Sequence, residues 1–275
     1  TYLGSGGGMY NYISSPTISN SIFSGNTAYY YGGGMYNSSS SPIISNSIFS
    51  GNTAYFYGGG MYNSSSSPQI RNSTISGNIA SIGGAEWYNY SGIPVIRNSI
   101  IWGNGIYGTL YNNQNSLIQG HLSTNNGNIS GAVDPLFMNP SSGDYRLQAC
   151  SPAINAGNNA LIPSEITTDI SGNPRIYETT VDMGAYEYQT STLVPIITTE
   201  PVNTTVCVGS MASFSITATN ATTYQWQENT GSGFNNLSNT ATYSGVATAI
   251  LTISNSTAAM YGYTYRAIVS GNCQP

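Results

Sequence analysis

A 26-residue repeat constrains the fold of this chain more than any other feature of its sequence. The block Gly-Gly-Gly-Met-Tyr-Asn at 6–11 returns at 32–37 and 58–63, and more loosely as Gly-Ala-Glu-Trp-Tyr-Asn at 84–89. A second block, rich in Ser, Ile and Asn, occupies 15–26, 41–52, 67–78 and 93–104. Copies at a constant offset with no insertion indicate one structural unit that stacks on itself.

Each repeat unit predicts strands and turns and not a helix. It lacks the helical period and contains short alternating runs, such as Ile44, Asn46 and Ile48 on one side. Gly, Asn, Ser and Pro separate these runs and predict turns. Three short strands and three turns fill roughly 26 residues, the size of one coil of a parallel β-helix. We therefore predict an all-β fold in which equivalent residues lie about 4.8 Å apart in successive coils.

Stacked coils bury equivalent side chains in rows, and the repeat predicts three apolar rows inside the helix. The first row is Met9, Met35, Met61 and Trp87, the second is Ile18, Ile44, Ile70 and Ile96, and the third is Ile22, Ile48 and Ile100. Thr74 interrupts the third row, so its hydroxyl needs a backbone hydrogen-bond partner.

Asparagine recurs at two turn positions of the repeat. The first set is Asn20, Asn46, Asn72 and Asn98, and the second set is Asn26, Asn52, Asn78 and Asn104. A stacked amide can donate to one neighbouring coil and accept from the other, and Asn tolerates left-handed backbone geometry. We predict that both sets are structural and that the first set forms a hydrogen-bonded ladder.

The charge content excludes several classes of protein. Only 10 Asp or Glu and 5 Lys or Arg occur in 275 residues, and the net charge is −5. Nucleic-acid binding needs clustered basic side chains, which these scattered residues do not provide. No run of about 18 apolar residues is present, so we expect no membrane span. Three Cys in a Lys-free, Asn-rich chain favour an extracellular or cell-surface location.

The repeat also resembles those of bacterial secreted and cell-surface β-helix proteins, including the polymorphic membrane proteins. The second half of the first domain carries a more specific pattern. In order, it contains Asp-Pro-Leu-Phe at 134–137, Asp-Tyr-Arg-Leu at 144–147, Ser-Pro-Ala-Ile-Asn-Ala-Gly at 151–157, Asp-Ile-Ser-Gly-Asn-Pro-Arg at 169–175 and Val-Asp-Met-Gly-Ala-Tyr-Glu at 181–187. This succession resembles the C-terminal coils of secreted choice-of-anchor proteins. The resemblance covers residues 1–189 and implies a right-handed parallel β-helix, secretion and display, without a known reaction.

We expect residues 105–189 to form less regular coils that end in a cap, because an uncovered end of a β-helix pairs with other chains. Most acidic residues lie here, namely Asp134, Asp144, Glu165, Asp169, Glu178, Asp182 and Glu187. With Arg146 and Arg175 they predict ion pairs that fix loops. A calcium site built from some of these carboxylates is kept as an alternative. No other cofactor is expected.

After a linker at 190–195 the pattern changes, and residues 196–275 predict a second domain. Alternating runs at 212–218, 223–227, 249–253 and 263–269 predict short strands. With an early Trp226 and a late Tyr265, this spacing resembles the Ig-like β-sandwich modules of bacterial surface proteins. The resemblance implies that Trp226 is the core tryptophan and that Tyr265 is the corner tyrosine.

The resemblance also bears on the cysteines and on the end of the sheet. Phe214 and Ala267 occupy the positions of the usual disulfide, so the resemblance implies that Cys207 pairs with Cys273 instead. Cys150 is then a small buried apolar residue or a link to another chain. The Ig-like sandwich lacks its last strand. We expect either that the native chain continues or that another segment supplies that strand.

Aromatic residues offer the best candidate for a ligand or assembly surface. Tyr10, Tyr36, Tyr62 and Tyr88 recur on the outward side, and Tyr30 and Phe56 lie in aromatic clusters one coil apart. Rows of rings about 5 Å apart could stack on sugar rings or contact a neighbouring protein. In the alternative interpretation the rings stack on one another and stabilise the helix.

We do not expect catalysis, because fold alone does not carry activity. Residues 1–78 contain no Asp or Glu, and His121 has no acid partner by spacing, whereas polysaccharide hydrolases need paired carboxylates. The sequence favours a non-catalytic extracellular protein with a structural or adhesive role. Its expected partners are copies of itself, neighbouring domains of a longer chain, or a glycan. Two alternatives stay open: a filament subunit completed by strand donation, and a glycan-binding or polysaccharide-cleaving module.

Overall fold

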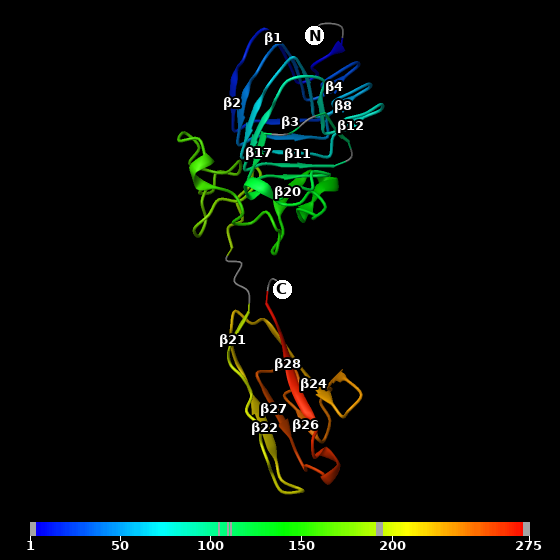
Figure 1. Ribbon diagram of the computed structural model, residues 1–275, viewed down its shortest axis with the longest axis vertical. Helices are drawn as coiled ribbons and strands as arrows, with labels where there is room; N and C mark the ends of the chain where they lie inside the picture. The colour runs from blue at the N-terminus through cyan, green and yellow to red at the C-terminus, as the bar shows by residue number, and fades with distance from the viewer. Residues whose placement is uncertain (1–3, 104, 109, 111, 191–194, 272–275) are drawn as a thin grey trace. The chain divides into compact units, whose positions relative to one another are not determined.

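The computed structural model describes residues 4–103, 105–108, 110, 112–190 and 195–271. The chain divides into two compact units, Thr1–Thr190 and Ser191–Pro275, and β-strands dominate both (Figure 1). The helices among the described residues are short 3-10 segments: η2 (Asn125–Gly127), η3 (Pro140–Ser142), η4 (Asn159–Leu161) and η5 (Ala258–Met260).

The first unit is a parallel β-helix in which each strand pairs with its equivalent in the next coil (Figure 1). The first sheet contains β1 (Met9–Tyr12), β5 (Met35–Ser38), β9 (Met61–Ser64), β13 (Trp87–Asn89) and β16 (Ile106–Tyr107). The second contains β2 (Thr17–Ser19), β6 (Ile43–Ser45), β10 (Gln69–Arg71), β14 (Val95–Arg97) and β17 (Asn112–Gln114). The third contains β3 (Ile22–Ser24), β7 (Ile48–Ser50), β11 (Thr74–Ser76), β15 (Ile100–Trp102) and β18 (Leu117–Ile118). The fourth contains β4 (Thr27–Ala28), β8 (Thr53–Ala54) and β12 (Ile79–Ala80).

The strand register confirms the predicted coil length. Met9 pairs with Met35, and Met35 pairs with Met61, so successive partners lie 26 residues apart. The last coil is shorter, because Trp87 pairs with Ile106, only 19 residues later. Two predicted inner rows are also confirmed: the side chains of Met35, Met61, Trp87, Ile44, Ile70 and Ile96 have no exposed surface.

The Gly-Gly-Gly block is required by the tight corner before the first sheet. Gly32 has a φ of 66°, in the left-handed region that favours glycine. A Cβ atom on Gly33 would lie 2.5 Å from the carbonyl oxygen of Gly59 in the next coil. A side chain on Gly33 would therefore press against the next coil, which explains why glycine recurs here in the first three copies; in the fourth copy Ala85 takes the equivalent position, next to the shorter coil.

The third apolar row differs from the prediction. Inside the helix lie Phe23, Phe49, Ile75, Ile101 and Ile118, and not Ile22, Ile48 and Ile100. Ile22 is 61% exposed. The corner at Asn20, with a φ of 49°, reverses the alternation between the second and third sheets. The inward and outward positions of the third sheet therefore cannot be predicted by continuing the alternation of the second sheet across this corner. The residues of the predicted third row lie on the outer side of the third sheet.

Residues 130–189, here called the covering segment, do not continue the helix as the expected irregular coils. Their strands β19 (Phe137–Asn139) and β20 (Asp144–Leu147) form an antiparallel hairpin. Side chains of the covering segment then pack on the outward row of the third sheet, in one cluster that contains Ile48, Ile100, Leu117, Phe137, Tyr145, Leu147, Ala153, Met183 and Ala185. This outward row is apolar, so it needs such a cover to leave water. Figure 1 shows the segment in green beside the later coils.

The Asn20 set forms only one rung of its predicted ladder. The amide of Asn46 donates to Asn20 Oδ1 at 2.6 Å, whereas Asn98 exchanges hydrogen bonds with the backbone of Asn158 in the covering segment. The side-chain atoms of Asn72 are buried without a hydrogen-bond partner among the described residues. All four residues have φ between 45° and 50°. Left-handed backbone geometry, and not a ladder, is therefore what this position requires.

Continuous amide ladders form at two other positions. In one, Asn26 donates to Asn52 at 2.9 Å and Asn52 donates to Asn78 at 2.9 Å. In the other, Asn11 donates to Asn37 and Asn37 to Asn63, each at 2.8 Å. The first ladder belongs to the second predicted set, whose member Asn104 lies outside the described residues. The Asn11 ladder was not predicted.

Ion pairs fix the covering segment, as predicted. Arg146 contacts Asp144 at 2.6 Å on the surface. Arg175 is buried and lies 3.9 Å from Glu187. Its guanidinium also donates to the carbonyl oxygens of Ala185 at 3.0 Å and Gly184 at 2.8 Å.

The second unit contains two three-stranded antiparallel sheets and one strand pair. The sheets have the orders β25 (Phe234–Asn236), β24 (Thr223–Asn229), β28 (Thr264–Ser270) and β22 (Ala212–Ser215), β27 (Ile250–Ile253), β26 (Tyr243–Ser244). The pair is β21 (Ile196–Thr199) with β23 (Thr217–Thr219). Both sheets contribute to one apolar cluster with Trp226 fully buried. The Trp226 indole donates to the Thr248 carbonyl oxygen at 2.9 Å.

Two predictions for the second unit are corrected. The hydroxyl of Tyr265 donates to Glu228 at 3.0 Å on the neighbouring strand, and not to an upstream backbone group as in a tyrosine corner. Cys207 is an exposed free thiol, and Cys273 lies outside the described residues. The predicted Cys207–Cys273 disulfide is therefore not observed. The backbone carbonyl oxygen of Cys207 accepts a hydrogen bond from the Ser256 hydroxyl, and the Cys207 side chain is exposed to solvent. Cys150, expected to be a small buried apolar residue or a link to another chain, is half-buried and takes part in a disulfide, so the first of these two expectations is wrong.

Candidate binding surfaces

A column of tyrosine rings runs along the outside of the first sheet. Tyr10, Tyr36, Tyr62 and Tyr88 follow one another with ring centroids 5.1 Å apart at each step. Tyr107, in the short coil, extends the column, because its ring stacks on that of Tyr88 with centroids 4.4 Å apart. Burial raises the pKa of the Tyr62 phenol well above its usual range, and this ring is only 8% exposed. The predicted surface tyrosines are thus brought together, but the middle of the column is covered.

A second group of rings flanks this column and is open to solvent. Tyr29 stacks on Tyr55 with centroids 5.6 Å apart and planes within 4° of parallel, and Tyr30 stacks on Phe56 at 5.5 Å. Tyr29 and Tyr55 are 62% and 55% exposed. Tyr31 joins the groups, because its ring lies 4.7 Å from that of Tyr62. We call the column and these flanking rings the aromatic face.

The orientation of the rings limits what the aromatic face can bind. Rings that stack on their equivalents in adjacent coils cover each other's faces and present edges and hydroxyls to solvent. A sugar that stacks on an aromatic ring needs an open face, and the faces that Tyr29 shares with Tyr55 and that Tyr30 shares with Phe56 are closed to it, which favours cross-coil stabilisation and edge contacts with protein. In the third coil Ser81 and Ile82 take the equivalent positions and the flanking stacks end.

The single carboxylate of the regular coils, Glu86, ends the ladder that begins at Asn26. It is buried, and it accepts hydrogen bonds from the backbone N–H of Asn78 at 3.2 Å and from its side-chain amide at 2.7 Å. Burial raises the pKa of Glu86 to about 7, against the opposing effect of these hydrogen bonds. Its carboxylate is the terminal acceptor of an amide chain and does not face solvent. This gives it a structural function in the helix.

The buried carboxylates of the covering segment surround Arg175. Burial raises the pKa of Asp182 to about 6 and that of Glu187 to about 7. Their oxygens are occupied by backbone donors, since Asp182 accepts from Asn155 at 2.7 Å and from Tyr188 at 2.6 Å. Among the described residues no group of three or more His, Cys, Asp or Glu side chains could hold a metal ion. The calcium alternative therefore gains no support here.

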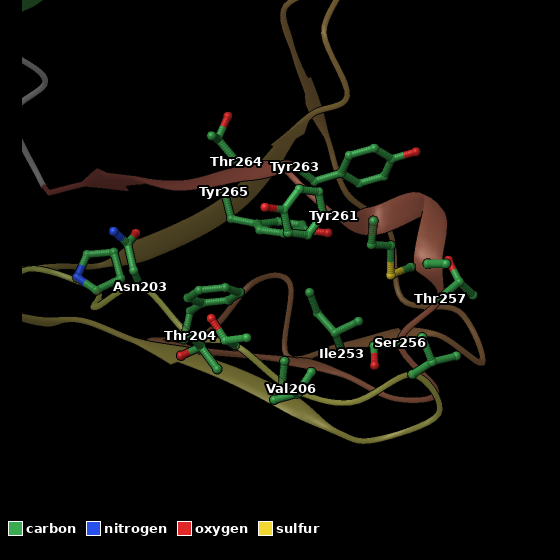
Figure 2. A pocket seen from close by; sticks show the side chains of 18 of the residues that line it. Asn203, Thr204, Val206, Ile253, Ser256, Thr257, Tyr261, Tyr263, Thr264 and Tyr265 are labelled. Carbon is green, nitrogen blue, oxygen red and sulfur yellow. The ribbon is translucent and has the colours of Figure 1, made fainter.

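The second unit carries a groove of about 960 Å³ along one side of its apolar cluster. Figure 2 shows the side chain of Tyr265 on one side of the space and those of Val206 and Ile253 on the other. In the described part of the chain, β28 pairs with β24 alone. Tyr265, Ala267 and Val269 point toward the cluster from β28 but are only partly buried. The groove thus leaves part of this core uncovered.

These features agree with one known family for the first unit. Residues 2–129 match the family model described as "Right handed beta helix region". The match covers the stacked coils and ends at the start of the covering segment. No curated protein matches the chain, and no solved structure matches it either. No helix in the described residues is long and apolar enough to cross a membrane.

Two features of the right-handed β-helix were missed by the sequence analysis although their signals were present. Asn11, Asn37 and Asn63 recur at the same 26-residue offset as the predicted rows. Arg71 and Arg97 recur likewise and are register partners on β10 and β14. Only the structure distinguishes an Asn that forms a ladder from an Asn that serves a corner, because the two differ in backbone φ and not in spacing.

Proposed function

We propose that this protein is a non-catalytic extracellular surface protein with a structural or adhesive role, which contacts protein partners through its aromatic face. The observation that carries the proposal is the exposed pair of stacks, Tyr29 on Tyr55 and Tyr30 on Phe56. Tyr side chains supply large contact area with few rotatable bonds and a hydroxyl that hydrogen-bonds, and they are enriched at protein interfaces. Rings already fixed by stacking lose little further entropy on binding.

The partner we propose is another copy of this chain or a neighbouring domain. Residues 1–78, which carry most of the aromatic face, contain no Asp or Glu and one Arg, so long-range charge attraction does not select its partner. We also propose that the second unit is an Ig-like β-sandwich, the kind of module that spaces surface domains apart. Its support is the shared cluster between two antiparallel three-stranded sheets around a buried Trp226.

Self-association of the purified chain tests this proposal. Sedimentation velocity over a wide concentration range should show reversible association, and the double variant Tyr29→Ser with Tyr55→Ser should weaken it at least tenfold. Tyr12→Ser is the matched control, because Tyr12 is 60% exposed and its ring contacts no other aromatic ring among the described residues. A monomer at every concentration, or equal loss in the control, would contradict the proposed use of the aromatic face.

A second candidate function is supported by the groove of the second unit. We propose as the alternative that the protein is a filament subunit in which a strand from a second copy lies in this groove and pairs with β28 on the side opposite β24. Such β-augmentation uses main-chain hydrogen bonds for affinity and alternate side chains for specificity. Exposed apolar residues line the approach to this groove, among them Val202 and Val208, which are 74% and 72% exposed.

Electron microscopy of the native material at near-physiological salt separates the two candidates. Ordered fibres whose formation is blocked by Ile268→Arg, a charge on the 42% exposed side of β28 away from the apolar cluster, would support strand donation. Ser215→Arg, on the other sheet, is the control substitution, because Ser215 is exposed and is not in the groove. Isolated particles under conditions where sedimentation shows association through the aromatic face would rule out the filament.

A further inference from the structure

Two arginines lie side by side on the outer surface of the second sheet. Arg71 on β10 and Arg97 on β14 are register partners, so their Cα atoms are one strand spacing apart, about 4.8 Å. Their strand neighbours Ile70 and Ile96 point inward and are fully buried, which places both guanidinium groups on the outside. In the two preceding coils the equivalent position is Ser19 and Ser45. The pair is therefore local to the third and fourth coils.

Both guanidinium groups are oriented by neutral oxygens and not by carboxylates. Arg71 donates to Gln69 Oε1 at 2.7 Å. Arg97 donates to the Asn112 side-chain oxygen at 2.8 Å and to the Asn112 carbonyl oxygen at 2.8 Å. The ion pairs in the described residues involve Arg146 and Arg175 instead. Two like charges on adjacent strands repel each other, so Arg71 and Arg97 form a positive site without a counter-charge.

A cavity lies directly against this pair. It has a volume of about 290 Å³ and is lined by Arg71, Arg97, Val95 and residues 160–162 of the covering segment. Ala160, Leu161 and Ile162 supply an apolar wall, which lowers the local dielectric and strengthens charge interactions inside. This volume is near the lower limit of about 300 Å³ for small-ligand pockets, which suits a single sugar ring better than a long apolar ligand.

We propose that this cavity binds the carboxylate of an acidic polysaccharide, with the carboxylate placed between Arg71 and Arg97. Guanidinium groups present donors in a planar fork that matches a carboxylate, and each arginine retains N–H groups beyond those used above. One carboxylate has two oxygens and reaches both partners when these lie one strand spacing apart. The binding also removes the repulsion between the two charges, which gives the interaction its driving force.

The surroundings favour a uronic acid over a simple inorganic anion. The amide groups of Gln69 and Asn112 hold the arginines through their oxygens, which leaves their N–H groups to pair with sugar hydroxyls. The aliphatic wall at Leu161 and Ile162 can pack against the apolar face of a sugar ring. This inference adds a ligand class to the proposed adhesive role and depends on that role for its biological meaning. The binding itself does not depend on the aromatic face, which is made of other residues.

Calorimetric titration with oligogalacturonate, at low and at physiological salt, tests this inference. The neutral probe is the fully methyl-esterified oligomer of the same length, which keeps the sugar rings but removes the charge. The acidic oligomer should bind at least tenfold more tightly than the ester, and added salt should weaken its binding. Arg71→Ser, which places in the third coil the residue that the second coil already has, should reduce the affinity at least tenfold, and so should Arg97→Gln.

Arg146→Gln is the matched control, because it removes the same charge at an exposed site with its own partner, Asp144. It should bind the acidic oligomer like the wild type, and thermal unfolding of each variant shows that the fold is kept. Equal affinity for ester and acid, retention of binding in the Arg71→Ser variant, or no heat at millimolar oligomer would overturn the inference. If sulfate or phosphate binds as tightly as the acidic oligomer, the site is a general anion site and the proposed preference for a sugar acid is wrong. A wild-type chain that binds the acidic oligomer but stays monomeric at every concentration would contradict only the aromatic-face proposal.

Discussion

The hydroxyl of Thr74 accepts a hydrogen bond from the backbone N–H of Ala185 at 3.0 Å, across 111 residues of sequence. Thr74 interrupts a row of apolar residues on the third sheet, between Ile48 and Ile100. The hydroxyl of Thr74 thus lies where the covering segment presents the backbone N–H of Ala185, and the two groups satisfy each other. The interruption in the repeat therefore marks the place where residues outside the repeat attach to it.

Thr74→Val tests this attachment. The substitution keeps the shape of the side chain but leaves the N–H of Ala185 buried without a partner, so we expect a loss of about 1–3 kcal/mol in the free energy of unfolding. Urea denaturation measures it. Thr74→Ser retains the hydroxyl and should lose less than half as much. If the two variants are equally stable, the hydrogen bond does not anchor the covering segment.

The amide ladder predicts different costs at its middle and its end. Asn52 is buried; it donates to Phe23 and Asn78 and accepts from Asn26. Asn52→Ala should cost about 2–4 kcal/mol, because several buried groups lose their partners at once. Asn26→Ala, at the half-buried end of the same ladder, should cost about 1 kcal/mol. Equal losses in urea denaturation would show that the ladder is not continuous.

The buried carboxylates predict that stability falls as pH rises. The pKa of Glu86 is raised from 4.5 to about 7 in the folded protein, so between these values the folded state binds more protons than the unfolded state. Stability from this group is complete below about pH 4.5 and is lost as the pH rises to about 7, by about 3 kcal/mol. Asp182 and Glu187 act in the same direction.

Glu86→Gln isolates this contribution. Free energies of unfolding, measured in urea from about pH 5 to about pH 8, should decrease less steeply in the variant than in the wild type. The pH dependence of the unfolding free energy that remains in the variant is then due to Asp182 and Glu187, whose pKa values are also raised. A wild type whose stability rises with pH over this range would mean that the hydrogen bonds from Asn78 to the ionised carboxylate outweigh its burial.

Arg175 predicts how the covering segment comes loose. Arg175→Met removes a fully buried cation that donates to the carbonyl oxygens of Ala185, Gly184 and Asp182. It leaves Asp182 and Glu187 without a counter-charge, and breaking such a buried pair costs about 3–5 kcal/mol. Hydrogen exchange should rise across residues 151–188 with the coils still protected. Arg146→Gln, on the surface, should cost less than about 1 kcal/mol.

Much of the right-handed β-helix could be predicted from the sequence, because the information is periodic. A constant offset is enough to pair Met9 with Met35 and Ile44 with Ile70. The tyrosine column follows by the same argument, since Tyr10 and Tyr36 share that offset. The direction in which its rings face could not be predicted, because side-chain packing between coils decides it and the repeat does not.

The sequence alone thus determined the strands, the coil length and most of the core, since backbone hydrogen bonds force each coil onto the register of the last. Tertiary structure decided the rest. The corner at Asn46, like that at Asn20 one coil earlier, reverses the alternation and turns Ile48 outward. The covering segment then buries Ile48, takes Asn98 out of the predicted ladder and places Leu161 beside Arg97. These contacts join residues 60 or more apart in the sequence, and no local pattern encodes which of them meet.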